Sequence, residues 1–168
     1  KDRLLICLTD IPERRLAEEA LIESERRFSQ VSELTREMIW EVDPAGLYTY
    51  VSSACFEMLG YYPDEITGKL HYYDLHPEEG REEFRTHLLK SIADHKPFVS
   101  YLNPVQTKDG RVLRISTNAA PVLAGDGSLI CYRGADRDVT EEKQNEARLA
   151  QAQKMESVGR LAGGVAHD

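Results

Sequence analysis

Three strand-like runs joined by two tight turns restrict the fold more than any other feature of this 168-residue chain. The runs cover residues 98–106, 111–122 and 128–137, and Asp-Gly pairs at 109–110 and 126–127 separate them. An Asp-Gly pair between apolar runs is a strong hairpin signal. In the middle run apolar and polar residues alternate from Leu113 to Ala119, which predicts one buried sheet face. We therefore predict three consecutive antiparallel strands.

A shorter hairpin and several helices precede these strands. Residues 38–43 and 47–51 read as two strands around the turn DPAG. Helical patterns follow at residues 53–59, 62–65, 72–75 and 80–95. In the longest of them Phe84, Leu88 and Ile92 recur at four-residue steps. The predicted class is α+β, an antiparallel five-stranded sheet with short helices on one side.

This order of elements resembles a PAS domain with its C-terminal PAC portion. The matching segments are residues 40–46 (WEVDPAG), 56–61 (FEMLGY), 63–69 (PDEITGK), 108–110 (KDG) and 138–140 (DVT). The resemblance implies a PAS fold, and we assign residues 34–140 to it. Ser52 departs from the family pattern, because many relatives have an asparagine at this position. The hydrogen bond that this asparagine makes in the relatives is therefore not implied for this chain.

Composition narrows the class of protein further. A net charge of −8 argues against nucleic-acid binding, which requires a concentrated basic face. The strongest aliphatic run, residues 4–8, is far shorter than the roughly 20 residues of a membrane span. Three widely spaced cysteines contain no Cys-x-x-Cys pair, so we predict reduced thiols and no metal site. We expect a cytoplasmic segment, and a membrane anchor elsewhere in the full-length protein stays open.

The junction at the end of the predicted domain has a second copy near the start of the chain. Residues 10–15 (DIPERR) match residues 138–143 (DVTEEK), each between a strand-like run and a helical pattern. We interpret residues 1–10 as the last strand of a preceding PAS-like domain and residues 11–33 as a linker helix. Heptad-like apolar positions, interrupted by Ser24, predict a coiled-coil homodimer through such linker helices. A solvated surface helix is the alternative.

A histidine and an acid, His167 and Asp168, end an apolar helical stripe at the C-terminus. The stripe consists of Met155, Val158, Ala162 and Val165, at three- and four-residue steps. A neutral imidazole is nucleophilic near neutral pH, and an adjacent carboxylate can support its developing positive charge. The pair therefore indicates phosphotransfer chemistry, although His-Asp alone is more typical of a solvated surface pair.

Residues 154–168 (KMESVGRLAGGVAHD) resemble the H-box of bacterial sensor histidine kinases. By that resemblance His167 is the phospho-acceptor and Asp168 the adjacent acid. Residues 141–168 are then a signalling helix that enters the dimerisation and phosphotransfer helix and is truncated after the H-box. The resemblance implies two partners in the full-length system, an ATP-binding domain and the receiver domain of a response regulator.

The predicted function is sensory input and signal relay in a two-component sensor histidine kinase. In the full-length protein the PAS domain would regulate autophosphorylation of His167, and the chain alone, which lacks the kinase's ATP-binding domain, would be inactive. The alternative is a ligand-free PAS dimerisation and relay module without its own stimulus. A self-contained enzyme is disfavoured, because no phosphate-binding Gly-x-x-x-x-Gly-Lys spacing is present.

We expect any ligand pocket between the sheet and the helices. Its predicted lining is Trp40, Phe56, Leu59, Phe84, Leu88, Tyr101, Ile115 and Tyr132, each with ordinary core as the alternative. A small-molecule ligand stays open. A photoreactive flavin of the LOV type is disfavoured, because residues 71–76 contain no cysteine. Haem is also disfavoured, although His87 and His95 on or near the long helix are candidate axial ligands.

Asp138 and Thr140 mark the point where the last strand becomes the exit helix. We predict that Thr140 is the N-cap, with Glu141 and Glu142 at the positive end of the helix. Asp138 is predicted to tie the junction to the body of the domain. We interpret the pair as a signal-coupling element, with a simple helix start as the alternative.

Overall fold

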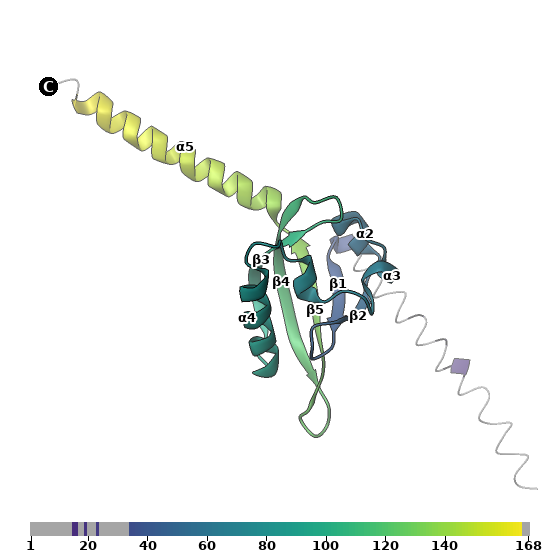
Figure 1. Cartoon of the computed structure of the whole chain (residues 1–168). Helices are drawn as coiled ribbons and strands as arrows, with labels where there is room; N and C mark the ends of the chain where they lie inside the picture. Colours follow the sequence, from purple (N-terminus) through teal and green to yellow (C-terminus); the bar gives the residue numbers. More distant parts are fainter. Residues whose placement is uncertain (1–14, 17–18, 20–22, 24–33, 166–168) are drawn as a thin grey trace, which may run out of the picture.

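The computed structural model describes residues 15–16, 19, 23 and 34–165, with side chains up to residue 156. Its five-stranded antiparallel sheet has the order β2-β1-β5-β4-β3 (Figure 1). The strands are β1 Met38–Val42, β2 Tyr48–Val51, β3 Phe98–Gln106, β4 Val112–Leu123 and β5 Leu129–Asp138. The predicted α+β fold is confirmed, including both hairpins between the last three strands.

Four helical segments lie between β2 and β3 along the described chain. They are α2 Ala54–Leu59, α3 Pro63–Ile66, the 3-10 helix η1 Tyr72–Leu75 and α4 Arg81–Ala93. The predicted stripe of α4 is buried, with Phe84, Leu88 and Ile92 at most 8% exposed. The helical segments lie against one face of the sheet, and the hydrophobic core forms between these two layers.

The opening hairpin turns at Asp43. Its Oδ1 accepts hydrogen bonds from the backbone N–H groups of Ala45 and Leu47, both at 2.9 Å. Gly46 has a φ of +84°, a conformation that residues with a Cβ rarely adopt. At the end of β2, the Ser52 hydroxyl oxygen accepts a hydrogen bond from the Ile39 backbone N–H at 3.0 Å. Ser52 therefore links the two strands at the position where many PAS relatives have an asparagine.

Gly134 on β5 allows the closest packing in the described sheet. It pairs with Trp40 of β1, and a Cβ added at Gly134 would lie 2.6 Å from Trp40 Cζ2 and 2.8 Å from Ala119 Cβ. No real Cβ tolerates such distances. The absent side chain therefore lets the Trp40 ring lie across β5.

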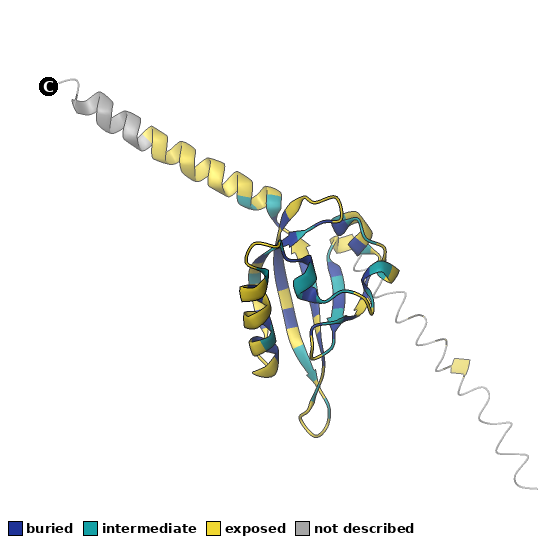
Figure 2. Cartoon of the chain, viewed as in Figure 1, coloured by how far each residue is buried: buried dark blue, intermediate teal, exposed yellow. Residues whose placement is uncertain are grey.

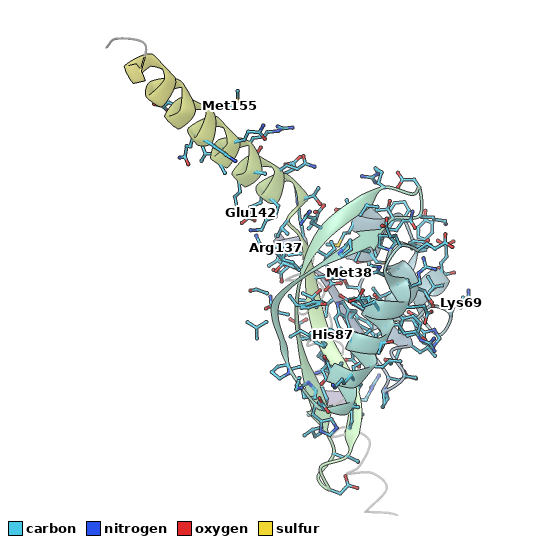
Figure 3. All side chains as sticks on the ribbon, turned by 60° about the vertical axis from the view of Figure 1, so that its left-hand side comes forward. Met38, Lys69, His87, Arg137, Glu142 and Met155 are labelled. Carbon is cyan, nitrogen blue, oxygen red and sulfur yellow. The ribbon has the colours of Figure 1, made fainter. Side chains whose placement is uncertain are left out.

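Helix α5, Thr140–Val165, extends away from the sheet as a single long helix (Figure 1). From Gln144 to Glu156 every side chain is exposed, and Figure 2 shows this stretch in yellow. Met155 projects from it with 69% of its surface exposed (Figure 3). Within the described residues, no helix has both the length and the apolar character that crossing a membrane requires.

Candidate functional site

The junction between β5 and α5 is held by the carboxylate of Asp138. Its Oδ1 accepts hydrogen bonds from the backbone N–H of Thr140 at 2.8 Å and from the Thr140 hydroxyl at 2.5 Å. The first helical bond runs from Lys143 N–H to the carbonyl of Val139, so Val139 occupies the N-cap position. The predicted N-cap at Thr140 is therefore corrected: Thr140 is the first helical residue and Asp138 supplies the capping acceptor.

Thr140 also connects the helix to the neighbouring strand. Its hydroxyl oxygen accepts a hydrogen bond from the backbone N–H of Arg114 on β4 at 2.8 Å. Next to it, the N–H of Val139, which is 3% exposed, donates to the carbonyl of Arg114 at 2.9 Å. Asp138, Thr140 and Arg114 thus form a continuous path from β5 through the start of α5 to β4.

An ion pair crosses the same junction on its solvent side. Arg137 Nη1 lies 3.3 Å from Glu142 Oε2, and both side chains are about half exposed (Figure 3). An open groove of about 610 Å³ runs alongside, between α2, β4 and the start of α5. Its lining includes Glu57, Arg111 and Asp138. The groove has basic and acidic groups on its wall, which does not select a ligand of one charge.

A second polar cluster lies inside the domain, at the centre of the sheet. Asp136 of β5 is 1% exposed, and its Oδ1 accepts a hydrogen bond from the hydroxyl of Thr117 on β4 at 2.7 Å. The Tyr72 hydroxyl of η1 lies 3.3 Å from both oxygens of this carboxyl and 2.8 Å from Thr117 Oγ1. Thr117 Oγ1 also lies 3.1 Å from Oδ1 of Asn103 on β3. We call these four residues the core polar cluster.

Burial determines the protonation behaviour of this cluster. It raises the pKa of Asp136 to about 6, although the hydrogen bonds from Thr117 and Tyr72 and the nearby N–H group of Trp40 oppose the rise. Burial, and secondarily the charge of Asp136, also raises the pKa of Tyr72 well above its usual range. Tyr72 is therefore a neutral hydrogen-bond donor at neutral pH.

Two buried donors face this cluster without a hydrogen-bond partner among the described residues. They are Nε1 of Trp40 and Nδ2 of Asn103. Each lies near enough to lower the pKa of a neighbour, Asp136 for Trp40 and Tyr72 for Asn103, but outside hydrogen-bond geometry. Because unpaired buried donors are costly, these two N–H groups lower the stability of the described core.

Most of the predicted pocket lining lies together in the core. Six of the eight residues are buried in one cluster: Trp40, Leu59, Phe84, Leu88, Ile115 and Tyr132. Tyr101 is partly buried and packs against that cluster. Phe56 lies outside it, because it is 46% exposed and stacks on Tyr62 at a centroid distance of 4.4 Å. The helix α2 turns its other side, with Cys55 and Leu59, toward the core.

The core polar cluster was not predicted from the sequence. The available signal was the alternation along β5, because Tyr132, Gly134 and Asp136 share one face of the strand. A carboxylic acid at an inward position requires partners inside the protein. Thr117 carries the same signal on β4, where the pattern had been read only as a buried face.

Neither candidate axial histidine is placed to ligate haem iron inside the domain. His87 is exposed on α4, where it stacks on Tyr101 at 6.0 Å, and His95 is exposed just after the helix. Among the residues that the structure describes, no group of three or more His, Cys, Asp or Glu side chains could hold a metal ion. His167 and Asp168, and the proposed strand at residues 1–10, lie outside the described residues.

Comparison with known proteins agrees with this architecture. A family model described as the PAS fold matches residues 48–135, more than half of the chain. The chain belongs to the PAS family. Its PAS domain superimposes on the structure of an RNA-binding light-oxygen-voltage receptor with a TM-score of 0.65 and 23% identity, covering 77% of this chain and 37% of the other. A PAS domain from Colwellia psychrerythraea gives a TM-score of 0.59 at 16% identity, covering 69% of this chain and 97% of the other.

Several sensor proteins are similar in sequence. The two-component sensor PprA of Pseudomonas aeruginosa is 27% identical over 162 residues, which is 95% of this chain and 17% of that protein. The sensor kinase CckA of Brucella abortus is 30% identical over 109 residues, which is 62% of this chain and 11% of that protein. The chain thus spans a small part of the relatives it matches. A PAS domain related to those of sensor kinases has a sensory role.

Proposed function

We propose that this chain is the sensory input and signal-relay segment of a two-component sensor histidine kinase. Its PAS domain regulates autophosphorylation of His167 in the full-length protein. The carrying observation is the hydrogen-bonded path from Asp138 through Thr140 to Arg114 at the start of α5. It couples the exit helix to two adjacent strands of the sheet, β5 and β4, which carry Asp136 and Thr117 of the core polar cluster.

The relay follows from the position of β5. This strand lies between β1 and β4, and it continues directly into α5. A change in the core that shifts β5 relative to β4 acts on the bonds of Thr140, which belong to both strands. The exit helix then changes its direction or its rotation, and the position of His167 changes with it.

The chemistry at His167 follows from its resemblance to an H-box. An imidazole nitrogen attacks the γ-phosphorus of ATP, forming an N–P bond as the P–O bond to the leaving ADP breaks. The ATP-binding domain of the full-length protein positions the nucleotide, and a receiver domain accepts the phosphoryl group from His167. We propose that the segment lies in the cytoplasm with these two partners. We also propose that it forms a homodimer through its linker helices, which light scattering tests by measuring the mass of the particle in solution.

Phosphate labelling of the full-length kinase tests the assignment. Wild-type protein should acquire acid-labile phosphate from labelled ATP, and His167→Gln should abolish it. Undiminished labelling of this variant would show that another residue accepts the phosphate. The chain without the ATP-binding domain should remain unlabelled unless that domain is added.

Asp138→Ala tests the relay separately. It should change the ratio of stimulated to basal labelling of His167 while the domain stays folded. Asp126→Ala is the matched control, because Asp126 Oδ1 accepts from the N–H and hydroxyl of Ser128 at 2.9 and 2.6 Å at the opposite end of β5. Equal ratios of stimulated to basal labelling in the wild type and both variants would show that the junction is only a linker.

The alternative is a ligand-free dimerisation and relay module. It is supported by the packing of six predicted lining residues into one hydrophobic core cluster. A small organic ligand would need space among these side chains, and the two candidate haem ligands, His87 and His95, are exposed. Native mass spectrometry of the purified chain separates the two cases, since a bound ligand adds a fixed mass.

A further inference from the structure

The two hydroxyl groups of the core polar cluster supply fewer protons than the neighbouring oxygens can accept when Asp136 is ionised. A hydroxyl group carries one proton, so Thr117 and Tyr72 together donate two hydrogen bonds. Three acceptor oxygens lie within reach: both carboxylate oxygens of Asp136 and Oδ1 of Asn103. The charged carboxylate takes both protons, because hydrogen bonds to charged groups are the stronger ones. The Asn103 oxygen is then left without a donor in the cluster.

One added proton completes the network. A protonated Asp136 donates to Thr117 Oγ1, which is 2.7 Å away. The Thr117 hydroxyl is then free to turn to Asn103 Oδ1 at 3.1 Å, and Tyr72 keeps donating to the second carboxyl oxygen. Protonation thus reverses the bond between Asp136 on β5 and Thr117 on β4, and it forms a new bond from Thr117 to Asn103 on β3.

The surroundings of Asp136 favour the uncharged form. The polar side chains that the structure describes around it are Tyr72 of η1, Tyr48 of β2, Trp40 of β1, Thr117 of β4 and Asn103 of β3. None is a cation, and the two titratable ones, Tyr48 and Tyr72, have pKa values raised well above the usual range by burial. The imidazole of His76 stacks on Phe84 of the adjacent α4, and its Nδ1 lies 2.9 Å from the Pro77 carbonyl.

We infer that Asp136 is a proton-binding site in the PAS core, and that its protonation turns the Thr117 hydroxyl from Asp136 to Asn103. The regulatory part of this inference rests on the proposed function. Thr117 pairs with Asp136 across the sheet, and Ile115 pairs with Asp138 in the same ladder. A shift of β4 against β5 at Thr117 therefore reaches Arg114 and Thr140 at the start of α5. The signal to which the kinase responds would be a fall in pH from neutral to mildly acidic.

The single tryptophan reports on proton binding directly. Trp40 is the only tryptophan of the chain, and its indole lies next to Asp136. Its fluorescence in the 168-residue chain should show one transition on acidification, with a midpoint near the pKa of about 6. Asp136→Asn should remove the transition, because an amide donates to Thr117 permanently. Asp64→Asn, the same change at an exposed position on α3, should leave the transition unchanged.

A second variant keeps the test informative if Asp136→Asn folds poorly. Thr117→Val keeps the shape of the side chain and removes the hydrogen bond that stabilises the carboxylate. The midpoint should then move to higher pH by about one unit. A wild-type chain without a transition, or a transition that survives Asp136→Asn, would overturn the inference.

Labelling of His167 in the full-length kinase tests the regulatory part. Labelling is measured in Asp136→Asn and in Asp64→Asn at mildly acidic and at alkaline pH. The ratio of the two should change about fivefold or more between these pH values, which is within the usual range of coupling between two sites. A constant ratio alongside a lost fluorescence transition would overturn the regulatory part alone. Failure of the proposed function looks different, because His167 then stays unlabelled in every variant while the Trp40 transition still depends on Asp136.

Discussion

Asp136 and Asp138 are the same residue type on the same strand, two positions apart, and the structure uses them in opposite ways. Asp136 is 1% exposed and bonds to side chains of other elements. Asp138 is exposed and bonds to the backbone and side chain of Thr140, two residues away. By alternation both side chains leave the same face of β5. The difference arises because the helical layer covers Asp136, whereas Asp138 lies where the sheet ends.

The two carboxylates have opposite effects on the stability of the domain. At Asp136 ionisation costs stability, because the charge is buried among neutral donors. At Asp138 the carboxylate stabilises the start of a helix, where its backbone N–H groups lack other acceptors. A substitution that removes the charge should therefore stabilise the domain at one position and not at the other.

The largest expected effect lies in the packing that surrounds Asp136. Gly134→Val should destabilise the domain by about 3 kcal/mol, because the new side chain would collide with the Trp40 ring and with Ala119. Urea denaturation followed by circular dichroism measures the change. Gly125→Val is the matched control, since a Cβ at Gly125 meets nothing within 4 Å. Equal stability of the two variants would contradict the close packing of β1 on β5.

The next effect is a pH-dependent stabilisation by Asp136→Asn. In the folded protein the pKa of Asp136 is raised to about 6, so the folded state binds more protons than the unfolded state between the unfolded pKa and about 6. This contribution is fully present below the unfolded pKa and is lost as pH rises through about 6. Asp136→Asn should therefore be more stable than the wild type by roughly 2 kcal/mol at alkaline pH and nearly equal at acidic pH.

Asp138→Asn is the control for that pH dependence. Asparagine still accepts hydrogen bonds at a helix start, and this variant keeps Asp136, so its stability should still fall as pH rises through about 6. Denaturant midpoints measured across the acidic and neutral range compare the three proteins. If both variants flatten the profile equally, the two aspartates do not differ as the structure indicates.

A smaller effect is expected from the loss of the cap. Asp138→Ala should destabilise the start of α5 by about 1 kcal/mol, because the N–H of Thr140 loses its acceptor. Hydrogen exchange at the amides of Thr140 and the following turn should accelerate, while exchange in the β4–β5 ladder stays slow. The Asp126→Ala variant should accelerate exchange only at the hairpin between those strands.

The contrast between the two aspartates also shows what the sequence could reveal. Turn chemistry and alternation are local signals, so the hairpins at Asp109 and Asp126, the buried stripe of α4 and the α+β class were predicted correctly. Asp138 was found because the strand-to-helix change is visible along the chain. The contact of Thr140 with β4 was not predicted, because the bond from the Arg114 N–H joins residues 26 positions apart.

The core polar cluster required tertiary information of a longer range. Tyr72 and Asp136 are 64 residues apart in the chain, and the layering of η1 over β5 brings them together. Phe56 lies outside the core cluster for a related reason. Its apolar character suits either side of a short amphipathic helix, and α2 buries Cys55 and Leu59 instead.

The smallest effect is expected at the ion pair that borders the exposed aspartate. Arg137 and Glu142 are each about half exposed at 3.3 Å, so solvent and salt screen their attraction. Arg137→Gln should change the stability of the domain by less than about 0.5 kcal/mol, and added salt should remove even that difference. The double variant with Glu142→Gln gives the coupling energy from a thermodynamic cycle. A coupling energy well above that of ordinary surface pairs would mean that Arg137, as well as Asp138, connects α5 to the sheet. The contrast between the buried and the capping aspartate would then explain only part of that connection.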